Sequence, residues 1–151
     1  MNYWLMKSEP DVFSIDHLQK KQVEPWTGVR NYQARNFMKE MKRGDQVLFY
    51  HSSADHVGVA GLMEVAREAY PDPTQFDKKS EYFDEKATKE KPRWEMVDVQ
   101  FLEKFKQLVT LAELRAEPKL AGLILLQKGT RLSVIPVEKN HFQLIQKMSK
   151  K

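Results

Sequence analysis

The order of hydrophobic and polar residues predicts five strands along the chain. Short runs of β-branched and aromatic residues, bounded by turn residues, are typical of strands. Such runs occupy residues 3–6, 46–51, 57–65, 93–101 and 131–137. The first run must end before Pro10, because proline disfavours helix in the residue before it and has no backbone donor. A segment of turn composition separates the second and third runs, so these two predict a hairpin.

A helical period is clearest between Asn31 and Lys42. Asn31 is a favourable N-cap, and Gly44 provides a stop. Near the N-terminal end of this helix, free N–H groups and the helix dipole favour an anion. Four apolar residues fall on one face, at the spacing i, i+3, i+4 and i+7: Ala34, Phe37, Met38 and Met41.

Shorter helices are predicted on both sides of this one. A serine N-cap begins a helix over residues 14–20, and a capping box at residues 110–113 begins another that must end before Pro118. Residues 141–145 predict a final helix against the sheet. Residues 120–126 fit a buried helix or a buried strand, and their spacing favours a short helix.

A long irregular stretch runs from residue 70 to residue 92. It is rich in proline and in charges of both signs and has few apolar residues. This composition predicts a solvated loop or a mobile flap, and loops of such length are often functional. We therefore expect a segment that can act as a lid.

Strands and helices do not alternate regularly, so the pattern does not predict a parallel doubly wound sheet. A mixed or antiparallel, barrel-like sheet with helices around it fits better, which places the chain in the α+β class. At 151 residues, the chain fits one domain over residues 1–151 with one core.

Composition restricts the classes of function. The chain has no cysteine, which excludes a disulfide framework, a zinc–thiolate site and a cysteine nucleophile. No apolar run reaches 18 residues, so we expect no membrane span and no signal peptide, and a cytoplasmic protein, or a nuclear one in a eukaryote. The net charge of +4 tolerates a polyanion without requiring one.

Catalytic and metal-binding patterns are weak. His51, Asp55 and His56 across a turn match no known ligand spacing. Ser52 or Ser53 with His51 and Asp55 is conceivable as a hydrolytic triad, but neighbours in sequence rarely reach the required geometry. No glycine-rich nucleotide loop or nucleophile elbow occurs. The sequence therefore predicts no catalytic residue, no metal and no cofactor.

Binding-type residues instead gather at the ends of predicted elements. The segment from Trp26 to Asn36 sets a tryptophan, two arginines and two asparagines at the mouth of a helix. Such a group suits a nucleotide, since a base stacks on an aromatic ring with roughly 1–3 kcal/mol whatever its identity. The alternative is that Trp26 is a core residue and the arginines coat a helix. The candidate binding residues are Lys7, Ser8, Trp26, Arg30, Asn31, Tyr32, Arg35, Tyr50, His51, Ser52, Trp94, Arg131 and Ser133.

Five segments that cover nearly the whole chain resemble the EVE domain family. They are residues 3–10, 26–36, 44–52, 92–99 and 131–137. The resemblance implies a PUA-like fold, in which a mixed β-sheet forms a pseudobarrel surrounded by short helices. It also implies a non-enzymatic reader of modified nucleic-acid bases, with modified cytosine in DNA as the favoured ligand.

Individual roles follow from the same resemblance. Trp26 matches the pocket tryptophan of the family, and Trp94 or Tyr32 would form other walls. Glu95 departs from the family pattern, because an apolar or neutral residue is expected there. An RNA-binding module of the PUA type is the alternative function, and an ASCH-like nucleic-acid hydrolase is a third. The remaining matches are polar positions around the pocket, Lys7, Ser8, Asn31, His51 and Ser52, and basic positions, Arg30, Arg35 and Arg131.

Overall fold

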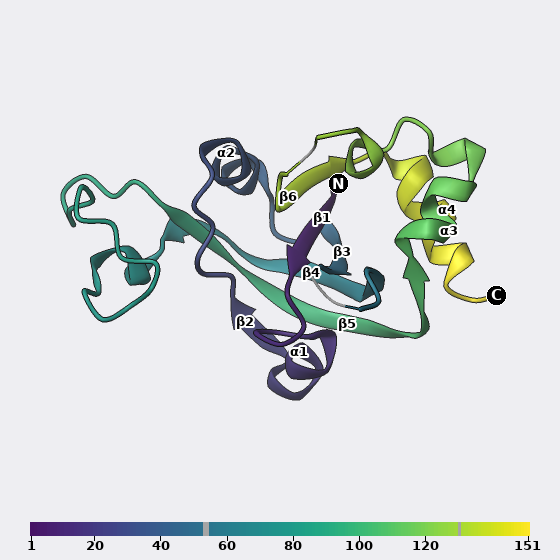
Figure 1. Ribbon diagram of the computed structural model, residues 1–151. Coiled ribbons are helices and arrows are strands. Elements are labelled where there is room, and N and C mark those ends of the chain that lie inside the picture. The colour runs from purple at the N-terminus through teal and green to yellow at the C-terminus, as the bar shows by residue number, and fades with distance from the viewer. Residues whose placement is uncertain (53–54, 130) are drawn as a thin grey trace.

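A computed structural model describes residues 1–52, 55–129 and 131–151. Ser53, which was considered above as a nucleophile, lies outside the described residues. Within them, a six-stranded sheet forms the centre of the molecule, in the order β2-β5-β4-β3-β1-β6 (Figure 1). The strands are β1 Tyr3–Ser8, β2 Val23–Pro25, β3 Gln46–His51, β4 Gly58–Pro71, β5 Glu95–Thr110 and β6 Val134–Val137.

The sheet is mixed, as predicted. Strand β1 pairs in parallel with β3, and every other described pairing is antiparallel. Strands β4 and β5 are 14 and 16 residues long, well above the usual length, and their pairing shifts register at four places. Bulges of this kind bend and twist a strand, so the long pair curves the sheet into a pseudobarrel that stays open.

Both faces of the sheet carry a hydrophobic core. Alternation along β1 sends Trp4 and Met6 to one face and Leu5 to the other. Helices α1 Ile15–Lys21 and α2 Tyr32–Glu40 both pack against the first core, and in Figure 1 they lie below and above the strands respectively. Helices α3 Leu111–Ala116 and α4 Lys139–Met148 cover the second face near one end of the molecule.

The local signals for helix starts are confirmed. The Ser14 side chain accepts from the His17 N–H, and the Asn31 side chain accepts from the Ala34 N–H. The capping box at Thr110 is present and begins α3. No helix of the described chain is long and apolar enough to cross a membrane.

Three predictions need correction. Residues 120–126 do not form one helix: 3-10 turns cover Pro118–Leu120 and Ile124–Leu126. Strand β2 was not predicted, because it has only three residues and ends in proline. The irregular stretch is displaced by two residues, since β4 runs on to Pro71 and β5 begins only at Glu95, and a 3-10 turn covers Pro73–Phe76 within it.

Candidate nucleic-acid interface

Six of the predicted binding residues meet at one end of the sheet. In the parallel pair β1–β3, Lys7 lies opposite Tyr50 and Ser8 opposite His51. The Ser52 N–H donates to the Ser8 carbonyl at 2.9 Å, and the Lys7 N–H donates to the Ser133 carbonyl at 2.8 Å. The sheet register therefore brings together residues that are up to 126 positions apart in sequence, from Lys7 to Ser133.

Strand alternation divides the four of these residues that lie in β1 and β3 between two faces. The His51 ring contacts the Phe49 ring edge-on at 5.5 Å, which puts it with the core under α2. The Ser8 hydroxyl donates to the Phe13 carbonyl at 2.6 Å on the same side. Lys7 and Tyr50 lie on the opposite face, with the Lys7 Nζ 6.0 Å from the centre of the Tyr50 ring. One compact pocket cannot include all six side chains.

Burial perturbs three ionisable groups at this edge, and it raises the pKa of the Tyr50 hydroxyl. Burial lowers the pKa of the His51 imidazole, an effect that the charge of Asp16 opposes. Burial also lowers the pKa of the half-buried Lys7 ammonium, and no carboxylate lies within ion-pair distance of it in the described chain. A phosphate near Lys7 would supply the missing counter-charge.

Trp26 belongs to the hydrophobic core, with 7% of its surface exposed. Its ring meets Phe49 edge-on at 5.5 Å and Phe13 at 6.1 Å. The indole N–H has no hydrogen-bond partner among the described residues, yet it is not fully shielded from solvent. Trp26 therefore exposes the edge of its indole ring with a free N–H donor, whereas stacking on a base requires an exposed ring face.

Four hollows on the described surface lie away from the predicted binding residues. They are lined by residues 1–4 and by residues from 103 onward. None of these four is lined by a predicted binding residue, so the candidate interface is defined by its contacts.

Arg30 is occupied inside the protein. Its guanidinium donates to the carbonyls of Tyr82 and Val29, and also to the side chains of Asp72 and Thr74, at 2.8–3.2 Å. The Tyr82 carbonyl accepts two of these bonds, so there are five bonds in all. They use all five N–H donors of the guanidinium. Arg30 therefore positions the loop between β4 and β5 and has no donor left for a phosphate.

The carboxylate of Asp72 attaches this loop to the segment that contains Gly28 and Arg30. This carboxylate is fully buried and accepts from Gly28 N–H at 2.8 Å, from Arg30, and from both the N–H and the hydroxyl of Thr74. The buried Gln75 side chain joins the loop to Trp94 by two further bonds. The expected flap is thus an anchored loop at these points.

Gly28 is required at its position for two reasons. Its φ of +87° lies in the left-handed region that side chains disfavour. A Cβ there would also lie 2.7 Å from the Tyr82 ring. The close approach lets the loop lie against the segment that begins at Trp26.

A ladder of rings and guanidinium groups forms a second part of the interface. Tyr32, at the first position of α2, stacks on Trp94 with 4.7 Å between ring centres. The Arg35 guanidinium lies 4.8 Å from the Tyr32 ring, and the Arg93 side chain donates to the Tyr32 hydroxyl. Tyr32 is 46% exposed and Trp94 only 6%, so Tyr32 is the accessible ring and Trp94 supports it from behind.

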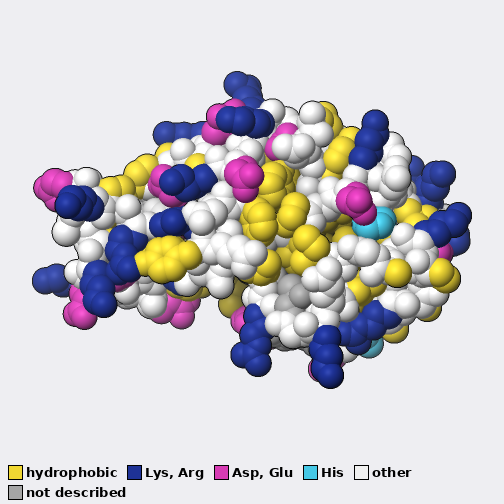
Figure 2. Space-filling view, turned by 90° about the horizontal axis from the view of Figure 1, so that it is seen from above, with side chains coloured by type: hydrophobic (Ala, Val, Ile, Leu, Met, Phe, Trp, Pro, Cys, Tyr) yellow, Lys and Arg dark blue, Asp and Glu magenta, His cyan; other side chains and the backbone are white. Residues whose placement is uncertain are grey.

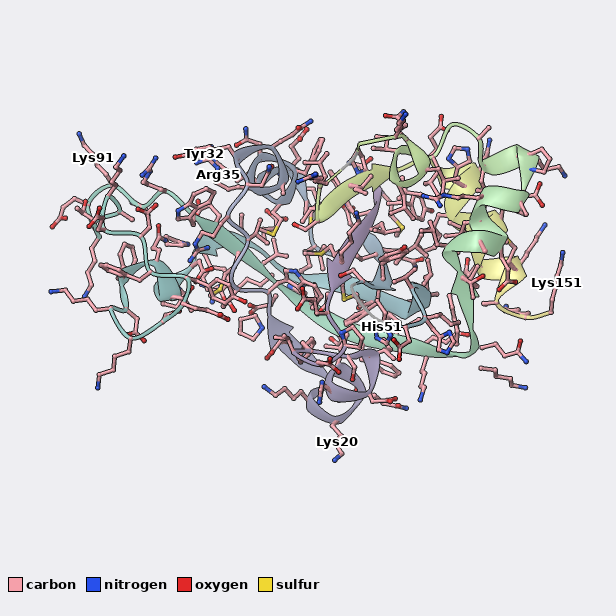
Figure 3. All side chains as sticks on the ribbon, viewed as in Figure 1. Lys20, Tyr32, Arg35, His51, Lys91 and Lys151 are labelled. Carbon is pink, nitrogen blue, oxygen red and sulfur yellow. The ribbon has the colours of Figure 1, made fainter. Side chains whose placement is uncertain are left out.

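Basic side chains surround this ladder. Figure 3 shows Tyr32 and Arg35 together at one side of α2, toward the loop that carries Lys91, while His51 lies nearer α1. In Figure 2, Lys and Arg side chains gather around a hydrophobic side chain at the loop end of the molecule. Arg131 is exposed and forms no ion pair with a described residue. These groups suit a polyanion.

Asn31, predicted both as an N-cap and as a binding residue, is the N-cap of α2, so its side-chain oxygen is already used by Ala34 N–H at 2.9 Å. Two other residues of the interface were not predicted from the sequence. Phe13 packs against both Trp26 and Phe49. Asp72 had no recognisable signal, because its partners lie up to 44 positions away in sequence.

Known proteins share the sequence and the fold of this chain. The family model of the EVE domain matches residues 2–148. Thymocyte nuclear protein 1 from Homo sapiens is 40% identical over 169 residues, which cover 99% of this chain and 75% of that protein. A structure of a hypothetical protein from Leishmania major is 52% identical, with a TM-score of 0.96 over 99% of this chain and 95% of that one.

A third comparison includes a ligand. The crystal structure of human THYN1 protein in complex with DNA that contains 5-methylcytosine is 40% identical to this chain. Its TM-score is 0.95, and the match covers 100% of this chain and 99% of that one.

Proposed function

This chain belongs to the EVE domain family, and from that premise we propose that it binds DNA containing a modified cytosine and catalyses no reaction. The observation that carries the proposal is the match, over the whole chain, to a human protein crystallised with 5-methylcytosine DNA. The interface described above supplies the chemistry that such a ligand needs, which is an aromatic surface, free donors and unpaired cations.

The proposed site lies between the end of β1 and the segment that begins at Trp26. A base can be read there only after it leaves the duplex stack, which costs a few kcal/mol. The edge of Trp26 and the half-buried Ser8 and His51 face the same core and would contact the base. Because only 7% of the Trp26 surface is exposed, we expect a small opening when DNA binds.

Contacts with the DNA backbone would come from cations that the fold leaves without a carboxylate partner. Lys7, Arg35 and Arg131 meet that condition in the described chain. Tyr32 offers an exposed ring for a neighbouring base, since stacking on an aromatic ring tolerates any base. Arg30 is excluded from this group because its donors are occupied.

Recognition of the methyl group itself gives modest discrimination. Burying one methyl group contributes about 0.8 kcal/mol, which corresponds to a factor of about four in affinity. A larger preference for the modified base requires polar contacts that the unmodified base makes less well. The expected signature is therefore a clear but limited preference for 5-methylcytosine over cytosine.

A binding titration tests the proposal. Fluorescence anisotropy with duplexes that differ only at one cytosine should give tighter binding to the 5-methylcytosine duplex. Equal affinity for the two duplexes would contradict the reader function. Tighter binding to RNA of the same sequence would favour the RNA-processing alternative, and cleavage of any of these oligonucleotides would contradict the non-enzymatic assignment.

A substitution at Trp26 locates the site. Trp26→Ala would remove a buried ring and destabilise the fold by about 3–5 kcal/mol. The milder Trp26→Phe is therefore the suitable variant. We expect it to weaken binding to the modified duplex by about tenfold. Trp4→Phe is a matched control, because Trp4 is equally buried but donates to Asp45 away from the interface. Equal binding by both variants would move the site away from Trp26.

A further inference from the structure

Among the buried side-chain nitrogen and oxygen atoms of the described residues, the Oε2 of Glu95 has no hydrogen-bond partner. Buried polar atoms are nearly always hydrogen-bonded, so an exception asks for an explanation. The second oxygen of Glu95 has no protein partner either, but solvent reaches it. The carboxylate therefore lies at a boundary, with one oxygen turned into the protein and one open.

The sheet register places Glu95 beside Trp26. Trp26 N–H donates to the Val97 carbonyl at 2.8 Å, which continues the antiparallel pairing of Pro25 with Asp98. Residues opposite each other share a face, and Glu95 is two positions from Val97 on β5, so it shares that face too. Glu95 is thus a diagonal neighbour of Trp26, on the side of the sheet that carries α2.

No described cation neutralises this carboxylate. No lysine, arginine or histidine lies within 4.0 Å of it among the described residues. Arg35 and Arg93 are near the start of β5, but Arg35 donates to the Arg93 carbonyl at 2.8 Å and Arg93 pairs with Asp84. The free acceptor of Glu95 and the free indole N–H of Trp26 therefore lie on the same face without protein partners.

Resting on the proposed function, we propose that Glu95 accepts a hydrogen bond from the exocyclic amine of the bound cytosine and so rejects thymine. Acidic side chains are the natural acceptors for the cytosine N4 amine. 5-Methylcytosine and thymine carry the same C5 methyl group, so a methyl recess cannot separate them. They differ at position 4, where cytosine has an amine donor and thymine a carbonyl acceptor.

The carboxylate discriminates because it can only accept. An ionised Glu has no donor, so a thymine carbonyl at the same place would set oxygen against oxygen and leave both unsatisfied. A site that hydrogen-bonds one substrate group rejects an analogue without it far better than a hydrophobic pocket separates two methyl patterns. Glu95 thereby supplies the polar selectivity that the methyl contact lacks.

The test compares Glu95→Gln with the wild type on three duplexes, with 5-methylcytosine, cytosine or thymine opposite guanine at one position. Glutamine has nearly the same shape, and its amide can donate to the thymine carbonyl. We expect the ratio of affinities for 5-methylcytosine over thymine to fall by about tenfold or more, or about 1.4 kcal/mol. Glu95→Met cannot accept, so it should lose affinity for both cytosine duplexes while binding of the thymine duplex is kept.

Glu103→Gln is the matched control, because it removes the same charge from the same strand at a position that lines a hollow with Ser149 and Lys150. It should leave the 5-methylcytosine-to-thymine ratio unchanged. If wild type prefers 5-methylcytosine over cytosine and Glu95→Gln keeps the full ratio over thymine, the Glu95 inference is overturned and the reader function stands. If wild type does not prefer 5-methylcytosine over cytosine, the reader function fails first and the inference with it.

Discussion

The imidazole of His51 accepts a hydrogen bond from the Ile15 N–H through Nε2 at 3.1 Å, at the start of α1. This bond requires an unprotonated Nε2, and burial lowers the pKa of His51 in agreement with it. A histidine can thus serve the fold as an acceptor that attaches α1 to the end of β3. The same ring faces the candidate site, so a change of its charge affects both stability and binding.

The sign of the pH effect follows from the direction of the shift. Because the folded pKa lies below the ordinary value of about 6.5, the unfolded chain binds the proton more readily. The contribution of His51 to stability is complete above that ordinary value. It is lost as the pH falls below it and through the folded pKa.

The His51→Gln variant should therefore lose less stability than wild type as the pH falls. Glutamine can still accept from the Ile15 N–H but does not gain a proton. The bond contributes about 1 kcal/mol, so between pH 7 and pH 5 the melting temperature of wild type should fall by about 2–4 °C more than that of the variant. His56→Gln changes an exposed histidine and is the control. Parallel melting curves for wild type and His51→Gln would contradict this role.

At the scale of elements, the loop between β4 and β5 depends on one pair of residues. Arg30 and Asp72 are 42 positions apart and join the Trp26 segment to the loop. Asp72 is fully buried, so removing its partner leaves a carboxylate with fewer donors. The loop in turn holds Trp94 under the exposed Tyr32 ring.

Two arginine variants separate support from binding. Arg30→Gln should destabilise the protein by about 2–3 kcal/mol, which lowers the melting temperature by about 5–10 °C. The loss is smaller than for a fully buried ion pair because Arg30 is partly exposed. The variant should leave the salt dependence of DNA binding unchanged in the fraction that is folded.

Arg35→Gln should change stability little and reduce the salt slope by about 0.9 if it loses one phosphate contact. The reverse pattern in calorimetry and salt titration would contradict the assignment.

The sequence predicted those elements whose signals are local. Asn31, Ser14 and Thr110 each begin a helix because a cap and its N–H partner are three positions apart. The loop after β4 was expected to be a solvated loop or a mobile flap. Its attachment could not be predicted, because it depends on Asp72 and Gln75, whose partners are distant in sequence. Composition describes the exposure of a loop but not its contacts.

At the scale of the whole molecule, the resemblance of five short segments predicted a mixed sheet in an open pseudobarrel. It also named Lys7, Ser8 and His51, and the parallel pairing of β1 with β3 brings these residues together with Tyr50, a candidate from its place at a strand end. Their division between two faces was not predicted, since it depends on which residue of each strand begins the alternation. For Trp26 the sequence left two alternatives, an open stacking surface and a core residue, and its 7% exposure places it in the core.

The overall charge determines how this protein should respond to salt. The net charge is only +4, and in the described chain a few cations near the interface lack a carboxylate partner: Lys7, Arg35 and Arg131. Three phosphate contacts give a slope of about −2.7 in a plot of log affinity against log salt concentration, which is shallow for a DNA-binding protein. Base contacts must then supply most of the specific affinity.

Titration of the 5-methylcytosine duplex between 50 and 200 mM salt, as an approximate range, should therefore give a slope near −3 for wild type. Lys7→Met should reduce its magnitude by about 0.9. The variant should also be slightly more stable than wild type, because burial lowers the pKa of Lys7 and thus penalises its charge in the fold. Lys20→Met, on the exposed face of α1 in Figure 3, should change neither quantity. A slope of about −6 or steeper would require phosphate contacts well beyond these three residues and would make electrostatics, rather than the base site, the main source of affinity.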